Sequence, residues 1–261
     1  MNKKSAARAA AVIEIGSNNV RMRISQWTKG RVVTLDRLEY PVSLGHDVFS
    51  TGSISFDSLR ELSAVLFKFS AALLSYNIEK PRVISCTALR EARNRALVVD
   101  QLKVRNGMDV AVLEDSQEKA YIYQEIIAKL GSGKPVQPGN TMIGYVGSGS
   151  IGVAVYDGEK IVYSQNISMG ALKLHDVLRR MRQESEDFHY IIEEYLDTIF
   201  NRVAIDRFQI KNLVLTGSQL ELVAQLCQAQ SPDGPYEIRT ENLTSLYKSI
   251  RSATAESIAN R

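Results

Sequence analysis

The sequence predicts an α/β protein with two domains, each built on a mixed sheet flanked by helices. Apolar runs with strand spacing are followed by amphipathic helices, and this order occurs twice. Each half opens with two strands joined by a short turn of glycine and small polar residues. A stretch rich in glycine and proline, 131–139, separates the two halves. We therefore expect domains at 9–130 and 138–261.

In the first half, the apolar run that begins at Ala11 ends in a polar turn, and an alternating run from Val20 to Ile24 follows at once. Apolar residues at helical spacing then predict a helix over 54–76. Ser116 is expected to cap a later helix. The remaining elements expected here are a strand at 31–38, a strand at 82–85, a helix from Thr87, a strand at 109–113 and a helix at 116–130.

The second half repeats the opening of the first, because 141–166 again has a strand, a glycine turn and two further strands. Two such units about 130 residues apart indicate a duplicated domain. Two unrelated β-meanders are the alternative. The elements expected afterwards are helices near 170–182 and 187–202, a strand at 212–215, and helices from Ser218 and Glu241.

The turns of the two hairpins have the composition of phosphate-binding loops, since small polar residues leave backbone N–H groups and hydroxyls free to face an anion. A third turn follows an apolar strand and opens a helix, whose first N–H groups also attract anions. Ordinary turns are the alternative in each case. The candidate phosphate-binding residues are Gly16, Ser17, Asn18, Asn19, Gly147, Ser148, Gly149, Ser150, Gly217 and Ser218.

Composition limits the function classes. The net charge is only +3 with 23% charged residues, so the whole chain is not a surface for coating nucleic acid. Cys86 and Cys227 are too few for a disulfide framework or a zinc site and suggest a reducing compartment. The best apolar segment, 62–74, is interrupted by Lys68 and is too short to span a membrane. We expect a cytoplasmic protein without a membrane or a specific nucleic-acid partner.

Four segments together resemble the exopolyphosphatase / guanosine pentaphosphate phosphatase family of the actin-like superfold. Ile13 to Arg21 is similar to the first phosphate loop of that family, and Tyr145 to Ser150 stands where the second belongs. Cys86 to Asn94 is similar to the family signature Thr-x-Ala-x-Arg-x-Ala-x-Asn, which is the most specific of the four. Met169 to Leu174 is similar to the family segment Gly-Ala-x-Arg-Leu.

The resemblance implies two actin-like, ribonuclease H-like domains with a cleft between them that binds phosphate chains. In the family, a terminal phosphoryl group is cleaved by water with Mg²⁺. The ligands implied are polyphosphate or a guanine or adenine nucleotide. Arg90 is expected to bind a phosphate through hydrogen bonds from two of its N–H groups. A homodimer is left open. The family pattern also continues with a final strand and helix after the segment that corresponds to 241–261.

The acidic residues depart from the family pattern. Glu14 stands for an aspartate in the first strand, and the only metal ligand that we assign is this carboxylate. Tyr145 stands for the aspartate that opens the second loop, and Ile151-Gly152 replaces a Thr-Glu pair. The catalytic glutamate directly precedes an alanine in the family, and here that position is Lys119. Glu118 is the nearest carboxylate, but adjacent helical residues point about 100° apart.

These departures predict that catalysis is impaired while anion binding persists. A general base alone contributes about 10²- to 10⁴-fold, and a protonated lysine cannot replace it. Our first hypothesis is a binder of phosphate chains with weak or no hydrolysis, in which Lys119 supplies a fixed cation and no cofactor is needed. An active hydrolase would use Mg²⁺ with Glu14 and Glu118 as acids. A non-catalytic interaction module is the third hypothesis, and Lys119 as a solvated surface lysine is the alternative for that residue.

Overall fold

The computed structural model describes residues 8–132, 137–181, 188–201, 203–217, 220–229 and 235–251. The chain forms two compact units. The first unit comprises Met1–Ile122 together with two short later segments, Ser148–Ser150 and Ser168–Val177. The second comprises Tyr123–Gly147, Ile151–Ile167 and Leu178–Arg261. The domain bounds expected from the sequence stay a prediction.

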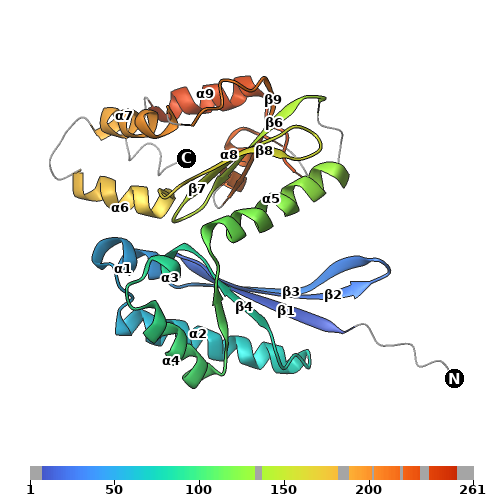
Figure 1. Cartoon of the computed structure of the whole chain (residues 1–261), viewed down its shortest axis with the longest axis vertical. Coiled ribbons are helices and arrows are strands. Elements are labelled where there is room, and N and C mark those ends of the chain that lie inside the picture. The colour runs from blue at the N-terminus through green and yellow to red at the C-terminus, as the bar shows by residue number, and fades with distance from the viewer. Residues whose placement is uncertain are drawn as a thin grey trace. The chain divides into compact units, whose positions relative to one another are not determined.

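The first unit is built on a five-stranded sheet of order β3-β2-β1-β4-β5 (Figure 1). Its strands are β1 (Ala9–Ile15), β2 (Asn19–Thr28), β3 (Arg31–Pro41), β4 (Arg82–Ser85) and β5 (Val110–Val112). The first three strands are antiparallel neighbours, whereas β1, β4 and β5 run parallel. Its helices are α1 (Leu44–Thr51), α2 (Phe56–Ser75), α3 (Thr87–Glu91), α4 (Arg95–Asn106) and the start of α5 (Asp115–Ser132).

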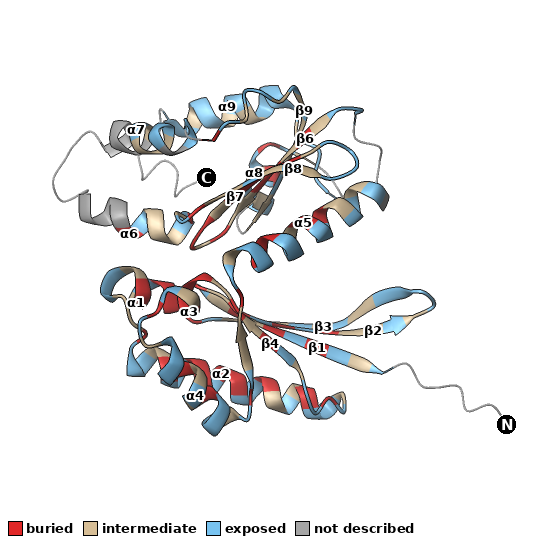
Figure 2. Cartoon of the chain, viewed as in Figure 1, coloured by how far each residue is buried: buried red, intermediate tan, exposed pale blue. Residues whose placement is uncertain are grey.

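The core of the first unit lies between this sheet and the helices α2 and α4 on one of its faces (Figures 1 and 2). The alternation in β1 and β2 places Ile13 opposite Met22, and both are buried. Helix α2 begins because Ser55 accepts a hydrogen bond from the Ser58 N–H at 3.1 Å. Its apolar stripe, which includes the fully buried Phe69, then covers the sheet.

One local expectation was wrong, and two features of the helices were not foreseen. Helix α1 was not predicted at all. A helix begins at Thr87 as expected, but it ends at Glu91 and a second helix follows, because Ala92 takes an extended conformation and the Arg93 N–H bonds to the Gly52 carbonyl at 2.9 Å. Ser116 is not a cap but the second residue of α5. The first helical bond of α5 runs from the Glu118 N–H to the Glu114 carbonyl at 3.0 Å.

Among the described residues, the second unit repeats the strand order of the first with one strand fewer, as β8-β7-β6-β9. Its strands are β6 (Asn140–Val146), β7 (Ile151–Tyr156), β8 (Ile161–Ile167) and β9 (Ile210–Gly217), and β6 pairs antiparallel with β7 and parallel with β9. The remaining helices are α6 (Ala171–Met181), α7 (Phe188–Phe200), α8 (Leu220–Leu226) and α9 (Thr240–Arg251). The shared strand order confirms the predicted α/β class with two mixed sheets flanked by helices.

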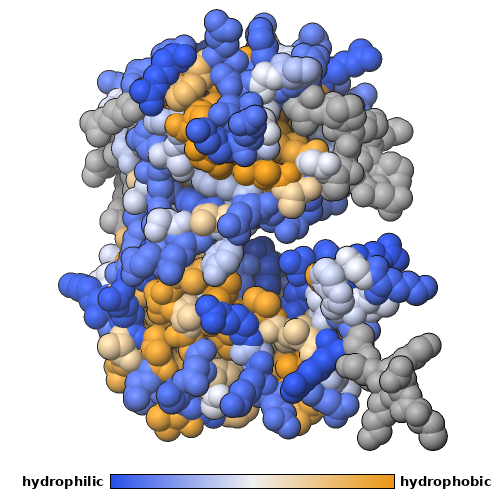
Figure 3. Space-filling view, turned by 45° about the vertical axis from the view of Figure 1, so that its right-hand side comes forward, coloured by the Kyte–Doolittle hydropathy of each residue, from blue (hydrophilic) through white to orange (hydrophobic). Residues whose placement is uncertain are grey.

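Apolar side chains reach the surface in patches among polar ones (Figure 3). The most exposed large ones in the sheet of the first unit are Trp27 and Val32, which face each other across β2 and β3. Within the part of the chain that the structure describes, no helix combines the length and the apolar composition needed to cross a bilayer.

Candidate functional site

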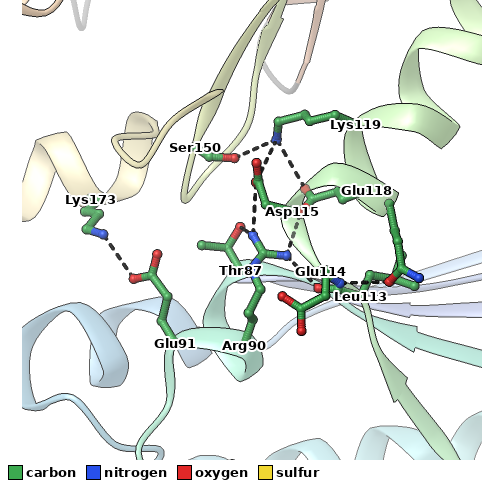
Figure 4. A network of polar contacts seen from close by, with 11 residues as sticks. Thr87, Arg90, Glu91, Leu113, Glu114, Asp115, Glu118, Lys119, Ser150 and Lys173 are labelled. Atoms are coloured by element: carbon green, nitrogen blue, oxygen red, sulfur yellow. Dashed lines mark hydrogen bonds and ion pairs between the residues drawn. The ribbon is translucent and has the colours of Figure 1, made fainter. Parts of the chain in front are cut away.

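The Arg90 side chain is the centre of a polar network in the first unit (Figure 4). It projects from α3, whose neighbouring residues Ala88 and Leu89 are buried in the core. One guanidinium nitrogen, Nη1, donates to the Leu113 carbonyl at 2.8 Å and to Glu118 Oε2 at 3.0 Å. The other, Nη2, donates to the Thr87 hydroxyl at 3.2 Å and to an oxygen of Asp115 at 3.4 Å. Both arms of the guanidinium therefore bind acceptors of this chain.

This arrangement bears on the expected role of Arg90. A phosphate gripped by both nitrogens has to share or displace the carboxylates that now hold them. The phosphate contact of Arg90 accordingly stays a prediction, while its pairing with Glu118 and Asp115 is what the structure shows.

Lys119 is buried, with 4% of its surface exposed. Its Nζ donates a hydrogen bond to the Ser150 hydroxyl at 2.8 Å and lies 3.8 Å from carboxylate oxygens of both Asp115 and Glu118. Burial lowers the pKa of Lys119, and the two carboxylates oppose this effect. The alternative of a solvated surface lysine is therefore wrong. Lys119 places an ammonium group against the second glycine turn.

Glu118 takes part in the same network from the next position of α5. Its side chain is 8% exposed; one oxygen binds Arg90, and the other lies near Lys119 (Figure 4). Adjacent helical residues diverge, but the two long side chains bend back to meet. The carboxylate is consequently held between two cations. A catalytic role for Glu118 stays a prediction.

Glu14 lies on β1, opposite Arg21 of β2. Burial raises the pKa of Glu14, Arg21 opposes this, and the nearby carboxylates of Glu118 and Glu39 raise it further. The fold thus favours the neutral carboxylic acid more than water does.

The residues present do not fit a resident Mg²⁺ ion. Mg²⁺ is bound through ionised carboxylates and phosphates in near-octahedral geometry. Here Asp115 and Glu118 face the cations Arg90 and Lys119. Among the residues that the structure describes, no group of three or more histidine, cysteine or acidic side chains is placed to hold a metal ion.

The first glycine turn keeps a compact, fixed shape. The Gly16 N–H bonds to the Asn19 carbonyl at 3.0 Å, and a β-carbon at Gly16 would meet that oxygen at 2.9 Å. The carbonyls of Ser17 and Asn18 accept from Gly45 and Val42, at 2.7 and 3.0 Å. Among the described residues, the N–H groups of Ser17 and Asn18 donate to no backbone carbonyl in a turn or loop. The Asn19 amide donates to Glu39 at 2.6 Å, so it turns along β3.

The tip of the second glycine turn, Ser148–Ser150, also belongs to the first unit. The Ser148 carbonyl accepts from the N–H groups of Leu172 and Lys173, at 3.0 and 3.3 Å. A β-carbon at Gly149 would lie 2.6 Å from the Thr87 methyl group, so only glycine allows the turn to approach α3 this closely. The turn therefore lies beside the Arg90 network, where Lys119 reaches it.

Two candidate residues lie elsewhere. Gly147 belongs to the second unit, where a β-carbon would clash with the Tyr145 ring. Gly217 ends β9 in the same unit with a φ of 148°, and a β-carbon there would meet the Val146 carbonyl oxygen at 2.1 Å. Glycine is therefore needed at 217 because the backbone conformation and the nearby Val146 carbonyl leave no room for a side chain. Ser218 lies outside the described residues.

Sequence reasoning missed several members of the network. Asp115 binds Arg90 and lies four residues before Lys119, a spacing that the sequence displays. The Thr87 hydroxyl and the Leu113 carbonyl leave no such trace. Lys173, from the segment that resembles Gly-Ala-x-Arg-Leu, pairs with Glu91 at 3.0 Å and lies 5.3 Å from the Phe49 ring.

Two mixed sheets that share a strand order, each containing a hairpin with a glycine turn, define the class of two-domain actin-like proteins. Within this class, the chain belongs to the Ppx/GppA phosphatase family, whose model matches residues 23–260. Solved relatives share the fold. An exopolyphosphatase from Cytophaga hutchinsonii has a TM-score of 0.81 at 18% identity, over 96% of this chain and 82% of that one. The Aquifex aeolicus family member has a TM-score of 0.73 at 20% identity, over 96% and 81%.

Curated relatives match over shorter stretches. A guanosine-5'-triphosphate,3'-diphosphate pyrophosphatase of Photobacterium profundum is 29% identical over 116 residues, which are 44% of this chain and 23% of that protein. The protein of the same name from Vibrio atlanticus is 22% identical over 162 residues, 62% of this chain and 32% of that protein. The matched regions thus span at most 32% of these relatives.

Proposed function

We propose that this protein binds a phosphate chain or a phosphorylated nucleotide at the Arg90 network of the first unit and hydrolyses it slowly or not at all. One observation carries the proposal. Lys119, which stands where the family resemblance places the catalytic glutamate, is buried and hydrogen-bonded to Ser150 of the second glycine turn.

The loss of hydrolysis follows from the state of the acidic groups. A base that activates water has to hold a free lone pair at neutral pH. Lys119 bonds to the Ser150 hydroxyl and lies beside Asp115 and Glu118, so the position of the catalytic glutamate offers no carboxylate to water. Asp115 and Glu118 are themselves paired with Arg90. Water therefore lacks an efficient carboxylate base.

Binding is supported by the donors that remain. Each glycine turn has backbone N–H groups, such as those of Ser17 and Gly149, that are available to an anion. Among the described residues, these two N–H groups donate to no backbone acceptor in a turn or loop. Lys119 adds a cation next to the second turn. In a buried site, such a charge acts through a low dielectric and is worth more than on the surface. The ammonium thus supplies part of the neutralisation that Mg²⁺ supplies to hydrolases, and binding needs no metal.

Titration calorimetry tests the proposal with long-chain polyphosphate, guanosine pentaphosphate and ATP, each with and without Mg²⁺. We expect a binding heat without Mg²⁺ that weakens as salt is added. Lys119→Met should weaken binding at least about tenfold, since one buried charge contact is worth 1.4 kcal/mol or more. Lys129→Met on the same helix is the matched control and should leave the affinity unchanged, because Lys129 is 72% exposed.

The other hypotheses predict different results. The active-hydrolase hypothesis predicts Mg²⁺-dependent turnover that Glu118→Gln abolishes. The interaction-module hypothesis predicts no heat with any of the three ligands at any salt concentration, and Arg90→Ala would then change no phenotype. Either result would replace our proposal. Placement in the cytoplasm and assembly into a homodimer stay predictions.

A further inference from the structure

The Ser150 hydroxyl is buried and lies next to the amine of Lys119. It is 2% exposed and lies at the end of the second glycine turn, directly before β7. Its Oγ lies 2.8 Å from Lys119 Nζ, which is closer than either carboxylate comes to that nitrogen, at 3.8 Å each. A lysine amine at this distance from a serine hydroxyl is the arrangement of a serine–lysine nucleophile pair.

The surroundings of Lys119 favour a role in proton transfer. The amine has to be neutral to accept a proton, and burial shifts Lys119 in that direction while Glu118 and Asp115 shift it back. Arg90 lowers the pKa of Lys119 further, and the two acids each have Arg90 as a nearer partner than Lys119. Cys86 is a further titratable neighbour, and burial raises the pKa of its thiol, which favours the neutral form.

We infer that Ser150 accepts a phosphoryl group from a bound phosphoanhydride, with Lys119 taking the hydroxyl proton. Ser150 Oγ forms a bond to the terminal phosphorus, and the bond from that phosphorus to its bridging oxygen breaks. The proton of the hydroxyl passes to Lys119 Nζ. The shortened phosphate chain, or a nucleoside diphosphate, leaves with the bonding electron pair on its oxygen. The products are phosphoserine 150 and a donor that is one phosphoryl group shorter.

This inference rests on the proposed function, because the donor has to occupy the phosphate site. It also explains why the modification would last. Hydrolysis of phosphoserine needs a base to activate water, and after the transfer Lys119 holds the hydroxyl proton and cannot serve as that base. The product also gains a charge pair, since the phosphate dianion and the ammonium of Lys119 would lie in contact. The protein would therefore be phosphorylated once per chain instead of releasing phosphate repeatedly.

The test is to incubate the full chain separately with ATP and with long-chain polyphosphate, and to follow its intact mass and its phosphopeptides over time. We expect one added phosphoryl group per chain, mapped to Ser150. A modification with polyphosphate alone, or with ATP alone, identifies the donor. Ser150→Ala should abolish the modification, and Ser70→Ala is the matched control, because the half-buried Ser70 hydroxyl donates to the Leu66 carbonyl of its own helix.

The role of Lys119 is tested by Lys119→Arg, which keeps the charge but cannot act as a base. We expect the phosphorylation rate at saturating donor to fall by about 10²-fold or more. The rate for the unmodified chain should rise with pH, since the neutral amine becomes more abundant. Binding heat without phosphorylation at any pH overturns this inference and leaves the proposed function standing. Absence of both heat and phosphorylation overturns the proposed function as well. A phosphopeptide that maps away from Ser150 overturns the assignment of the acceptor, whether or not the alanine variant folds.

Discussion

Two lysines of α5, Lys119 and Lys129, have similar sequence surroundings but differ in exposure, since one is buried and the other is solvated. Each follows an acidic residue by four positions, Asp115 before Lys119 and Glu125 before Lys129. Lys129 is 72% exposed and forms a 3.3 Å surface pair, whereas the Lys119 side chain is 5% exposed and reaches Ser150. The same spacing thus gives a solvated ion pair in one turn of the helix and a buried charge network in another. What differs is the set of groups that lie opposite each turn.

The largest expected effect comes from removing the buried charge. Lys119→Met leaves Asp115 and Glu118 with Arg90 as their nearest cation, and breaking a buried ion pair on one side costs about 3 kcal/mol. Urea unfolding followed by circular dichroism measures this loss. A loss for Lys119→Met that matches the loss for Lys129→Met would show that the Lys119 contacts are no stronger than those of a surface lysine.

The approach of the second turn to α3 is tested by Gly149→Ala. The added methyl group would lie 2.6 Å from the buried Thr87 side chain, so the turn has to move away from α3. We expect a loss of about 1–3 kcal/mol and weaker phosphate binding. Gly131→Ala, where a β-carbon meets nothing within 4 Å, is the control and should not destabilise the protein. If Gly149→Ala bound phosphate as tightly as the parent protein, the second glycine turn would not be part of the binding site.

Glu14 provides a smaller effect that depends on pH. Its folded pKa is raised, so between the unfolded value near 4.5 and the folded value the native state binds more protons, and stability falls as pH rises through that window. Glu14→Gln removes this penalty. The variant should be more stable than the parent at pH 7, with a difference that shrinks as the pH falls below 4.5. If the stability difference between Glu14→Gln and the parent were larger at low pH, the pKa of Glu14 would be lowered in the folded state and not raised.

The smallest effect is expected for Lys129→Met. Exposed pairs at this spacing contribute about 0.3–0.5 kcal/mol, and added salt screens them. The difference from the parent protein should therefore vanish in unfolding measurements at high salt. A loss that persists in salt would mean that Lys129 does more than pair with Glu125, and the contrast between the two lysines would weaken.

The fold was predictable because it depends on local patterns. Alternation in β1 and β2 and the stripe of α2 appear directly in the sequence. Helix α1 was missed because it is only eight residues long and contains Gly45. It is held by a partner elsewhere in the chain, since the Gly45 N–H bonds to the Ser17 carbonyl at 2.7 Å. The break at Ala92 also depends on a distant partner, the Gly52 carbonyl that binds Arg93.

The candidate site was predictable only in part. Arg90 and Lys119 stand out through the family resemblance, but their partners depend on where separate elements end. The Leu113 carbonyl reaches Arg90 because β5 ends beside α3, and no residue type marks a carbonyl in advance. The burial of Lys119 was equally undecided, since Lys129 shows that its spacing to an acidic residue suits a surface position as well.

The most direct test of the central claim is the number of orthophosphate molecules released per chain from long-chain polyphosphate with Mg²⁺, measured at high protein concentration. Because Lys119 has replaced the base, we predict no release above background by the unmodified chain, in samples where calorimetry detects binding. Lys119→Glu combined with Tyr145→Asp is expected to gain turnover. Many phosphates released per unmodified chain in a Mg²⁺-dependent reaction would contradict the account and identify an active hydrolase.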